Sequence, residues 1–148
     1  MLATTGPDLT VRLWDVSSHQ QLGDPLAGHA NLADNLMFSP DGSTLYTSSK
    51  DGTLRLWDVS SHRQLDSPLT GYTGTARLVA LSPNGRALAI VGTDAVVRLW
   101  DVSSHRQLGQ PFGQASIVGG MAFSPDGRTL AAAGLDNTVR MWDVSGLY

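Results

Sequence analysis

A seven-residue motif that ends in Trp-Asp-Val occurs four times in the chain. Its first copy covers residues 10–16. The motif tryptophans follow one another at intervals of 43, 43 and 42 residues. They belong to four Trp-Asp pairs: Trp14-Asp15, Trp57-Asp58, Trp100-Asp101 and Trp142-Asp143. A fixed period of this length indicates a repeat architecture, in which each repeat buries its apolar surface against its neighbours.

The repeat at residues 28–70 divides into four short extended segments. We expect strands at 34–38, 44–48, 53–57 and 63–69, because turn residues separate these segments. The first separator is Ser-Pro-Asp-Gly, in which proline presets φ and glycine accepts a positive φ. The same turn recurs at 82–85, with Asn for Asp, and at 124–127. Short, evenly spaced strands without helical periodicity predict an all-β fold.

The period, the Ser-Pro-Asp-Gly turn, the Gly-His pair at 28–29 and the terminal Trp-Asp together resemble the WD-repeat family of β-propellers. The resemblance implies four-stranded antiparallel blades around a channel, with the Trp-Asp strand third from the centre. The chain is then one propeller segment, residues 1–148, of about three and a half blades. The expected blades are a partial one at 2–27, complete ones at 28–70 and 71–112, and a partial one at 113–148.

The resemblance also implies a buried hydrogen-bonded tetrad of a histidine, a hydroxyl residue, an aspartate and the tryptophan in each blade. Only the blade at 28–70 has all four members: His29, Thr47, Asp51 and Trp57. In the next blade Tyr72 and Ile90 replace the histidine and the hydroxyl, and in the last blade Gln114 and Ala132 do so. These replacements leave the hydrogen bonding of Asp94 and Asp136 open.

Two catalytic or metal-binding interpretations compete with the structural one. Thr47, His29 and Asp51 are also the residue types of an activated nucleophile, which leaves a hydrolase as a remote alternative. No nucleophile-elbow or oxyanion motif accompanies them, so we expect no catalytic residues. Histidines recur five residues after the first three tryptophans, but ligands must lie about 2 Å from one ion. We therefore expect no metal site and no cofactor, and we expect the arginine two residues before each tryptophan to pair with a nearby aspartate.

Composition narrows the class of protein further. The net charge is −3, so the chain lacks the basic surface typical of a nucleic-acid-binding protein. It has no cysteine, no apolar run of about 18 residues and no signal-peptide pattern at its start. These features predict a cytoplasmic protein that does not enter membranes.

The resemblance implies a non-catalytic scaffold that binds protein or peptide partners. Partners of the family often contact the loops before the first strand and between the second and third strands. These loops differ among the repeats, whereas the turns on the opposite side are near copies, so specificity is expected in them. The candidate binding residues are Asn31, Asp34, Lys50, Tyr72, Thr75, Gln114, Ser116 and Leu135. The alternative is a natural or engineered fragment of a longer regulatory protein with no function of its own.

Two further expectations concern conformation and assembly. The turn at Asp8-Leu9 should keep Leu9 at negative φ, because a bulky side chain disfavours the left-handed region. Four blade positions cover about half a ring of the usual size, so we expect a homodimer that closes one eight-bladed propeller. The open ends should expose apolar residues, among them Leu13, Trp14, Met141 and Trp142.

Overall fold

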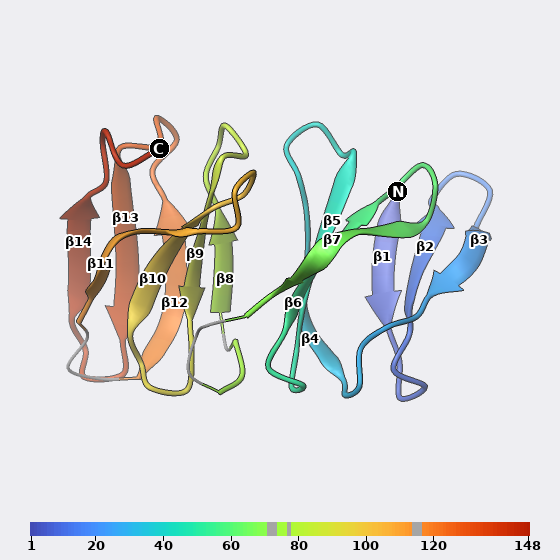
Figure 1. The fold of residues 1–148 in the computed structure, drawn as a ribbon, viewed down its shortest axis with the longest axis horizontal. Coiled ribbons are helices and arrows are strands. Elements are labelled where there is room, and N and C mark those ends of the chain that lie inside the picture. The colour runs from blue at the N-terminus through green and yellow to red at the C-terminus, as the bar shows by residue number, and fades with distance from the viewer. Residues whose placement is uncertain (71–73, 77, 114–116) are drawn as a thin grey trace. The chain divides into compact units, whose positions relative to one another are not determined.

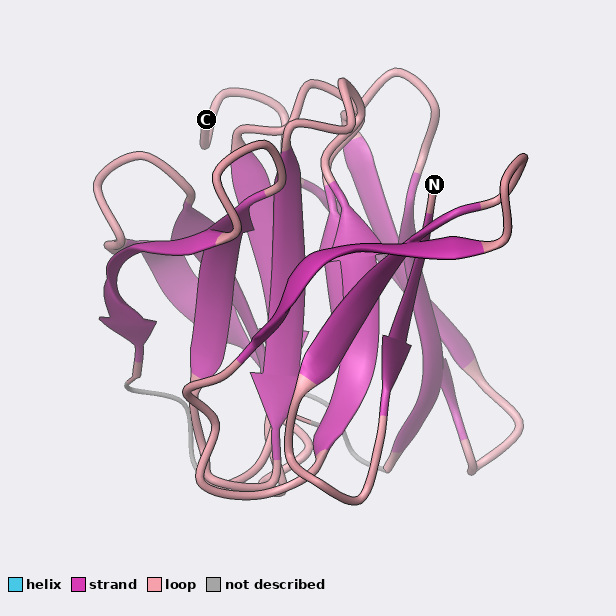
Figure 2. Cartoon of the chain, turned by 90° about the vertical axis from the view of Figure 1, so that its right-hand side faces the viewer, coloured by secondary structure: helices cyan, strands magenta, loops and turns pink. Residues whose placement is uncertain are grey.

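The computed structural model describes residues 1–70, 74–76, 78–113 and 117–148. These residues form strands and loops without a helix (Figure 2). In this part of the chain, fourteen strands make four antiparallel sheets of three, four, four and three strands, which confirms the all-β, blade-type fold predicted from the sequence. The chain divides into two units, residues 1–70 and 71–148, and each unit contains two of the sheets.

The first unit contains sheets 1 and 2, each a meander of hairpins in chain order (Figure 1). Sheet 1 consists of β1 (Leu2–Thr5), β2 (Val11–Asp15) and β3 (Gln20–Leu26). Sheet 2 consists of β4 (Ala33–Phe38), β5 (Thr44–Ser49), β6 (Leu54–Asp58) and β7 (Arg63–Leu69). The strands expected for the repeat at 28–70 are all present, and their ends differ from the expected ones by at most one residue.

The second unit repeats this construction. Sheet 3 consists of β8 (Leu78–Leu81), β9 (Ala87–Val91), β10 (Val97–Asp101) and β11 (Gln107–Phe112). Sheet 4 consists of β12 (Val118–Phe123), β13 (Thr129–Gly134) and β14 (Val139–Asp143). The Trp-Asp pairs lie in β2, β6, β10 and β14. These are the third strands of sheets 2, 3 and 4 and the second strand of the three-stranded sheet 1.

The Ser-Pro-Asp-Gly turns have the conformation that their residues predict. The backbone N–H of Gly42 donates to the carbonyl of Ser39 at 2.9 Å, and Gly42 has a φ of 73°. The Ser39 hydroxyl donates to a carboxylate oxygen of Asp41 at 2.5 Å and accepts from the N–H of Thr44 at 2.9 Å. Gly85 and Gly127 have the same φ, so one turn type joins the first two strands of sheets 2, 3 and 4.

The prediction for Leu9 is wrong, because its φ is 65°. The N–H of Leu9 donates to the carbonyl of Gly6 at 3.1 Å, as that of Gly52 donates to Ser49 at 3.1 Å. The hairpin between the second and third strands therefore imposes a left-handed residue after the aspartate, whichever side chain it carries. The strain of about 1–2 kcal/mol is offset by the turn's hydrogen bonds.

Each sheet has two distinguishable faces, because side chains alternate along a strand. We call the face with the motif tryptophan the tryptophan face, and the other, with the residues one and three positions before it, the leucine face. In the first unit, Val11 and Leu13 on the leucine face of sheet 1 belong to one buried cluster with Leu45 and Trp57 on the tryptophan face of sheet 2. This cluster is the core of the unit.

The core of the second unit follows the same rule. Val97 and Leu99 on the leucine face of sheet 3 cluster with Leu130 on the tryptophan face of sheet 4. Trp142 packs against this cluster, with its ring centroid 5.3 Å from that of Phe112. Leu13 is 2% exposed, so the expectation that Leu13 and Trp142 lie on open surface is wrong: both point into the core of their own unit.

Candidate functional site

The structure brings together the four residues of the sequence-predicted tetrad. His29 precedes β4, Thr47 lies in β5, Asp51 lies in the turn after β5, and Trp57 lies in β6. His29 Nδ1 is 3.0 Å from Asp51 Oδ2, and His29 Nε2 is 2.7 Å from Thr47 Oγ1. The Trp57 indole N–H donates to the same Thr47 oxygen at 2.8 Å. The network therefore joins the entry loop, two strands and one turn of sheet 2.

The contacts of His29 determine its protonation state. Burial lowers the pKa of His29, despite the opposing effect of Asp51, so the ring is neutral at pH 7. Because Nδ1 faces a carboxylate, it carries the proton and donates to Asp51, which leaves Nε2 as the acceptor for the Thr47 hydroxyl. Thr47 thus donates to His29 and accepts from Trp57. Its side chain is fully buried, so the hydrogen bonds of the network lie in the interior of the unit.

Asp51 is the carboxylate of the network, and it accepts several hydrogen bonds. It accepts from the N–H of Ala30 at 2.9 Å and from the N–H and hydroxyl of Thr53 at 2.9 and 2.7 Å. Burial acts to raise the pKa of Asp51, but these hydrogen bonds and the one from His29 hold it well below its ordinary value. A negative charge is therefore fixed beneath the loop at residues 29–34.

The other sheets use arginine where sheet 2 uses histidine. Asp94 pairs with Arg98 at 2.8 Å, and Asp136 pairs with Arg140 at 3.3 Å, which answers the question left open for these two aspartates. In sheet 1, Asp8 likewise pairs with Arg12 at 2.6 Å. The prediction that these arginines pair with aspartates is confirmed in the three sheets.

The same prediction is wrong for Arg55. Its guanidinium donates to Gln64 Oε1 at 2.5 Å. The carboxylate that Arg55 would otherwise reach is that of Asp51, which His29, Ala30 and Thr53 already use as an acceptor. The histidine of the tetrad therefore displaces the arginine from the carboxylate.

The hydroxyl of the network decides whether the tryptophan is paired. In sheet 1, the Trp14 indole N–H donates to Thr4 Oγ1 at 2.8 Å. In sheet 3, the residue at this register position is Ile90, and the buried Trp100 indole N–H has no hydrogen-bond partner among the described residues. Within the described part of the chain, sheet 3 thus contains a buried donor without an acceptor, a costly arrangement in a protein interior.

The aspartates of the Trp-Asp pairs organise the turn that follows. Asp58 accepts from the Ser60 hydroxyl and from the N–H of Ser61, both at 2.7 Å, and these bonds lower its pKa to about 2. Asp15, Asp101 and Asp143 each accept from the serine hydroxyl two residues later. These carboxylates are accordingly structural parts of a repeated turn.

The candidate binding residues of the first unit lie at one edge of sheet 2. The N–H of Lys50 donates to the carbonyl of Leu32 at 3.0 Å, which holds the turn after β5 against the loop before β4. Asn31, Asp34 and Lys50 are exposed, and the Lys50 ammonium is 3.8 Å from Asp34. This edge of sheet 2 therefore presents an amide from the loop before β4, a carboxylate from the start of β4 and a lysine from the turn after β5.

Ser49 is a further residue of this edge, and its role was not predicted from the sequence. Its hydroxyl donates to the carbonyl of Asn31 at 2.9 Å and accepts from the N–H of Asp51 at 3.0 Å. Ser49 thus links the candidate loop to the tetrad turn. The sequence does contain a signal for Ser49. The equivalent positions of the next two repeats hold Gly92 and Gly134, so only the repeat with the complete tetrad has a hydroxyl at this position.

The corresponding residues of the second unit are placed only in part. Leu135 is 67% exposed, and its N–H donates to the carbonyl of Ile117 at 2.9 Å, so turn and loop meet here as well. Thr75 is partly exposed. The other three candidates, Tyr72, Gln114 and Ser116, lie outside the described residues.

The described residues include no group of three or more His, Cys, Asp or Glu side chains close enough to hold a metal ion. Within the same part of the chain, no helix is long and apolar enough to cross a membrane.

The family model for the WD domain, G-beta repeat, matches residues 21–58, 64–101 and 106–143. The chain therefore belongs to the WD40 repeat family. Such repeats form propeller-type scaffolds for protein interaction and are in general non-catalytic. The matches begin in the last strand of one sheet, or in the third case one residue before it, and each ends at the Trp-Asp of the next sheet, as 21–58 runs from β3 to β6. No curated protein matches the sequence.

Proposed function

We propose that this chain is a non-catalytic scaffold that binds a protein or peptide partner at the loop edge of its sheets. The observation that carries the proposal is the edge of sheet 2, where Asn31, Asp34 and Lys50 are exposed beside the buried tetrad, on the loop before β4, the start of β4 and the turn after β5. A rigid support lowers the entropy lost on binding, and the edge offers both charges and an amide to a polar partner. The corresponding loops of the other repeats differ in sequence, as expected where a repeated frame carries specificity.

The test compares variants of this edge with a variant elsewhere. Asn31→Ala with Lys50→Ala should reduce capture of a partner identified with the wild-type protein at least tenfold. Arg106→Ala, an exposed change in the turn between β10 and β11, should leave capture unchanged. Equal capture by all three proteins would contradict this placement of the binding surface. Hydrolytic turnover that is lost in His29→Ala would instead support the hydrolase alternative.

We further propose that a second copy of the chain completes a closed propeller. Two chains of four sheets each would supply eight blade positions, which is within the range of about four to eight for closed rings. Light scattering at micromolar concentration distinguishes this homodimer from a monomer of 15.7 kDa. Polydisperse aggregates would instead support the alternative that the chain is a fragment of a longer propeller-containing regulatory protein.

A further inference from the structure

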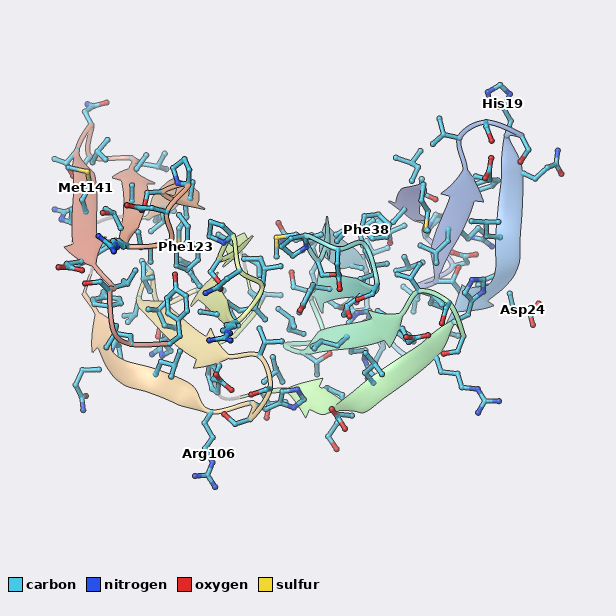
Figure 3. All side chains as sticks on the ribbon, turned by 90° about the horizontal axis from the view of Figure 1, so that it is seen from above. His19, Asp24, Phe38, Arg106, Phe123 and Met141 are labelled. Atoms are coloured by element: carbon cyan, nitrogen blue, oxygen red, sulfur yellow. The ribbon has the colours of Figure 1, made fainter. Side chains whose placement is uncertain are left out.

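The leucine face of sheet 4 is exposed to solvent, whereas the leucine-face residues of the other three sheets are buried. The residue before the motif tryptophan is 2% exposed as Leu13, 5% as Leu56 and 0% as Leu99, but 70% exposed as Met141. The residue two positions earlier shows the same contrast. It is 0% exposed as Val11, Leu54 and Val97, but 66% exposed as Val139. Met141 lies on β14, an edge strand of sheet 4 (Figure 3).

One tryptophan face is also open where its counterparts are buried. The leucine that pairs in register with the motif tryptophan is fully buried as Leu45, Leu88 and Leu130. In sheet 1 the corresponding residue is Leu2, opposite Trp14, and it is 54% exposed. Sheet 1 and sheet 4 therefore leave opposite faces uncovered.

The two units show what such faces pack against. The leucine face of sheet 1 covers the tryptophan face of sheet 2, and the leucine face of sheet 3 covers that of sheet 4. In both cases a leucine before the tryptophan joins a cluster that contains the leucine opposite the next tryptophan. Val139 and Met141 occupy the positions of the leucine face in this packing. Leu2 and Trp14 occupy the positions of the tryptophan face.

We infer that the leucine face of sheet 4 binds the tryptophan face of sheet 1 in a second copy of the chain, in a head-to-tail seam. The inference rests on the proposed closure of the ring and names the surfaces that make it. Since the contact is between two different patches, each seam uses Met141 of one copy and Leu2 of the other. Two copies related by a two-fold axis have two identical seams.

The test uses one charge on each side of the seam. Met141→Asp and Leu2→Asp should each weaken self-association at least tenfold and yield a monomer of about 15.7 kDa in light scattering, because a carboxylate would be buried without a partner. Leu135→Asp makes a similar change at an apolar residue that is 67% exposed in the turn after β13, away from both faces, and it should leave the oligomer intact. All three sites are exposed, and circular dichroism checks that each variant is folded.

Mixing the two seam variants tests the head-to-tail geometry. The Leu2→Asp copy keeps an intact leucine face and the Met141→Asp copy keeps an intact tryptophan face, so an equimolar mixture should recover a heterodimer through one unaltered seam. Failure of the mixture to associate would overturn the inference, as would a wild-type oligomer that neither variant disrupts. A monomeric wild type would instead refute the closure of a ring, while binding of a partner at the loop edge would stand.

Discussion

Replacing Trp57 and Trp100 by phenylalanine, one at a time, measures what the tetrad contributes to stability. Both side chains are buried, at 2% and 7% exposure, and both lie at the same position of equivalent strands. The substitution removes similar volume at each site. At Trp57 it removes a hydrogen bond to Thr47, and at Trp100 it removes an indole N–H that has no partner among the described residues.

The expected difference follows from that contrast. Trp57→Phe loses a buried hydrogen bond, worth about 0.5–1.5 kcal/mol net, in addition to the packing loss that both variants share. Trp100→Phe removes a buried donor for which the described residues offer no acceptor, and this gain offsets part of the packing loss. We therefore expect Trp57→Phe to lower the free energy of unfolding by about 1–3 kcal/mol more than Trp100→Phe.

Urea unfolding followed by circular dichroism gives both values, at one fixed protein concentration because self-association would add to stability. The slope of the unfolding free energy against urea should be the same for the two variants. Equal losses of stability would refute the reasoning, since they would show that the Trp57–Thr47 hydrogen bond adds nothing to the packing of the ring.

Three other predictions concern single groups. Burial lowers the pKa of His29 in the folded chain, so below pH about 6.5 the unfolded chain binds more protons than the folded one. The contribution of His29 to the free energy of unfolding should therefore be constant above that pH and fall as the pH is lowered from it. The dependence of stability on pH should be flatter in His29→Ala. Ala95 has a φ of 57°, so Ala95→Gly should raise the melting temperature and Ala95→Val should lower it; no difference between the two would contradict the assigned turn. The Arg98–Asp94 pair is shorter and less exposed than the Arg140–Asp136 pair, so Arg98→Ala should destabilise the fold more than Arg140→Ala, by about 0.5 kcal/mol or more in urea unfolding.

Local sequence patterns predicted the parts of the fold that local chemistry determines. The strand boundaries of sheet 2 follow from turn residues, and the positive φ of Gly42 follows from the closing position of its turn. The members of the tetrad were predicted through the family resemblance, because each occupies a fixed place in the repeat. The same information could not show that Ile90 leaves the Trp100 indole unpaired, since that depends on every neighbour of a buried atom.

The failures share a physical cause, which is competition between partners. Leu9 adopts a left-handed conformation because the hydrogen bonds of the hairpin outweigh its own preference. Arg55 turns to Gln64 because other donors already occupy the carboxylate of Asp51. Leu13 is buried because an exposed end of a repeat array has only one open face, and the sequence motif does not say which. Each outcome needs coordinates for two or more neighbours.

The offset between the sequence repeat and the sheet has a consequence for how such a chain can change its length. A repeat such as 21–58 contributes its first strand to one sheet and its other three strands to the next. Gain or loss of one whole repeat by recombination therefore removes and restores a strand in the sheet at the junction, and every sheet inside the array keeps its four strands. A crossover placed between two sheets, after β7 for example, would preserve the strand number only if it fell in the linker between the last strand of one sheet and the first strand of the next. The arrangement thus lets an array grow or shrink by crossover within the genetic repeat, without a requirement that the crossover coincide with the edge of a folded layer.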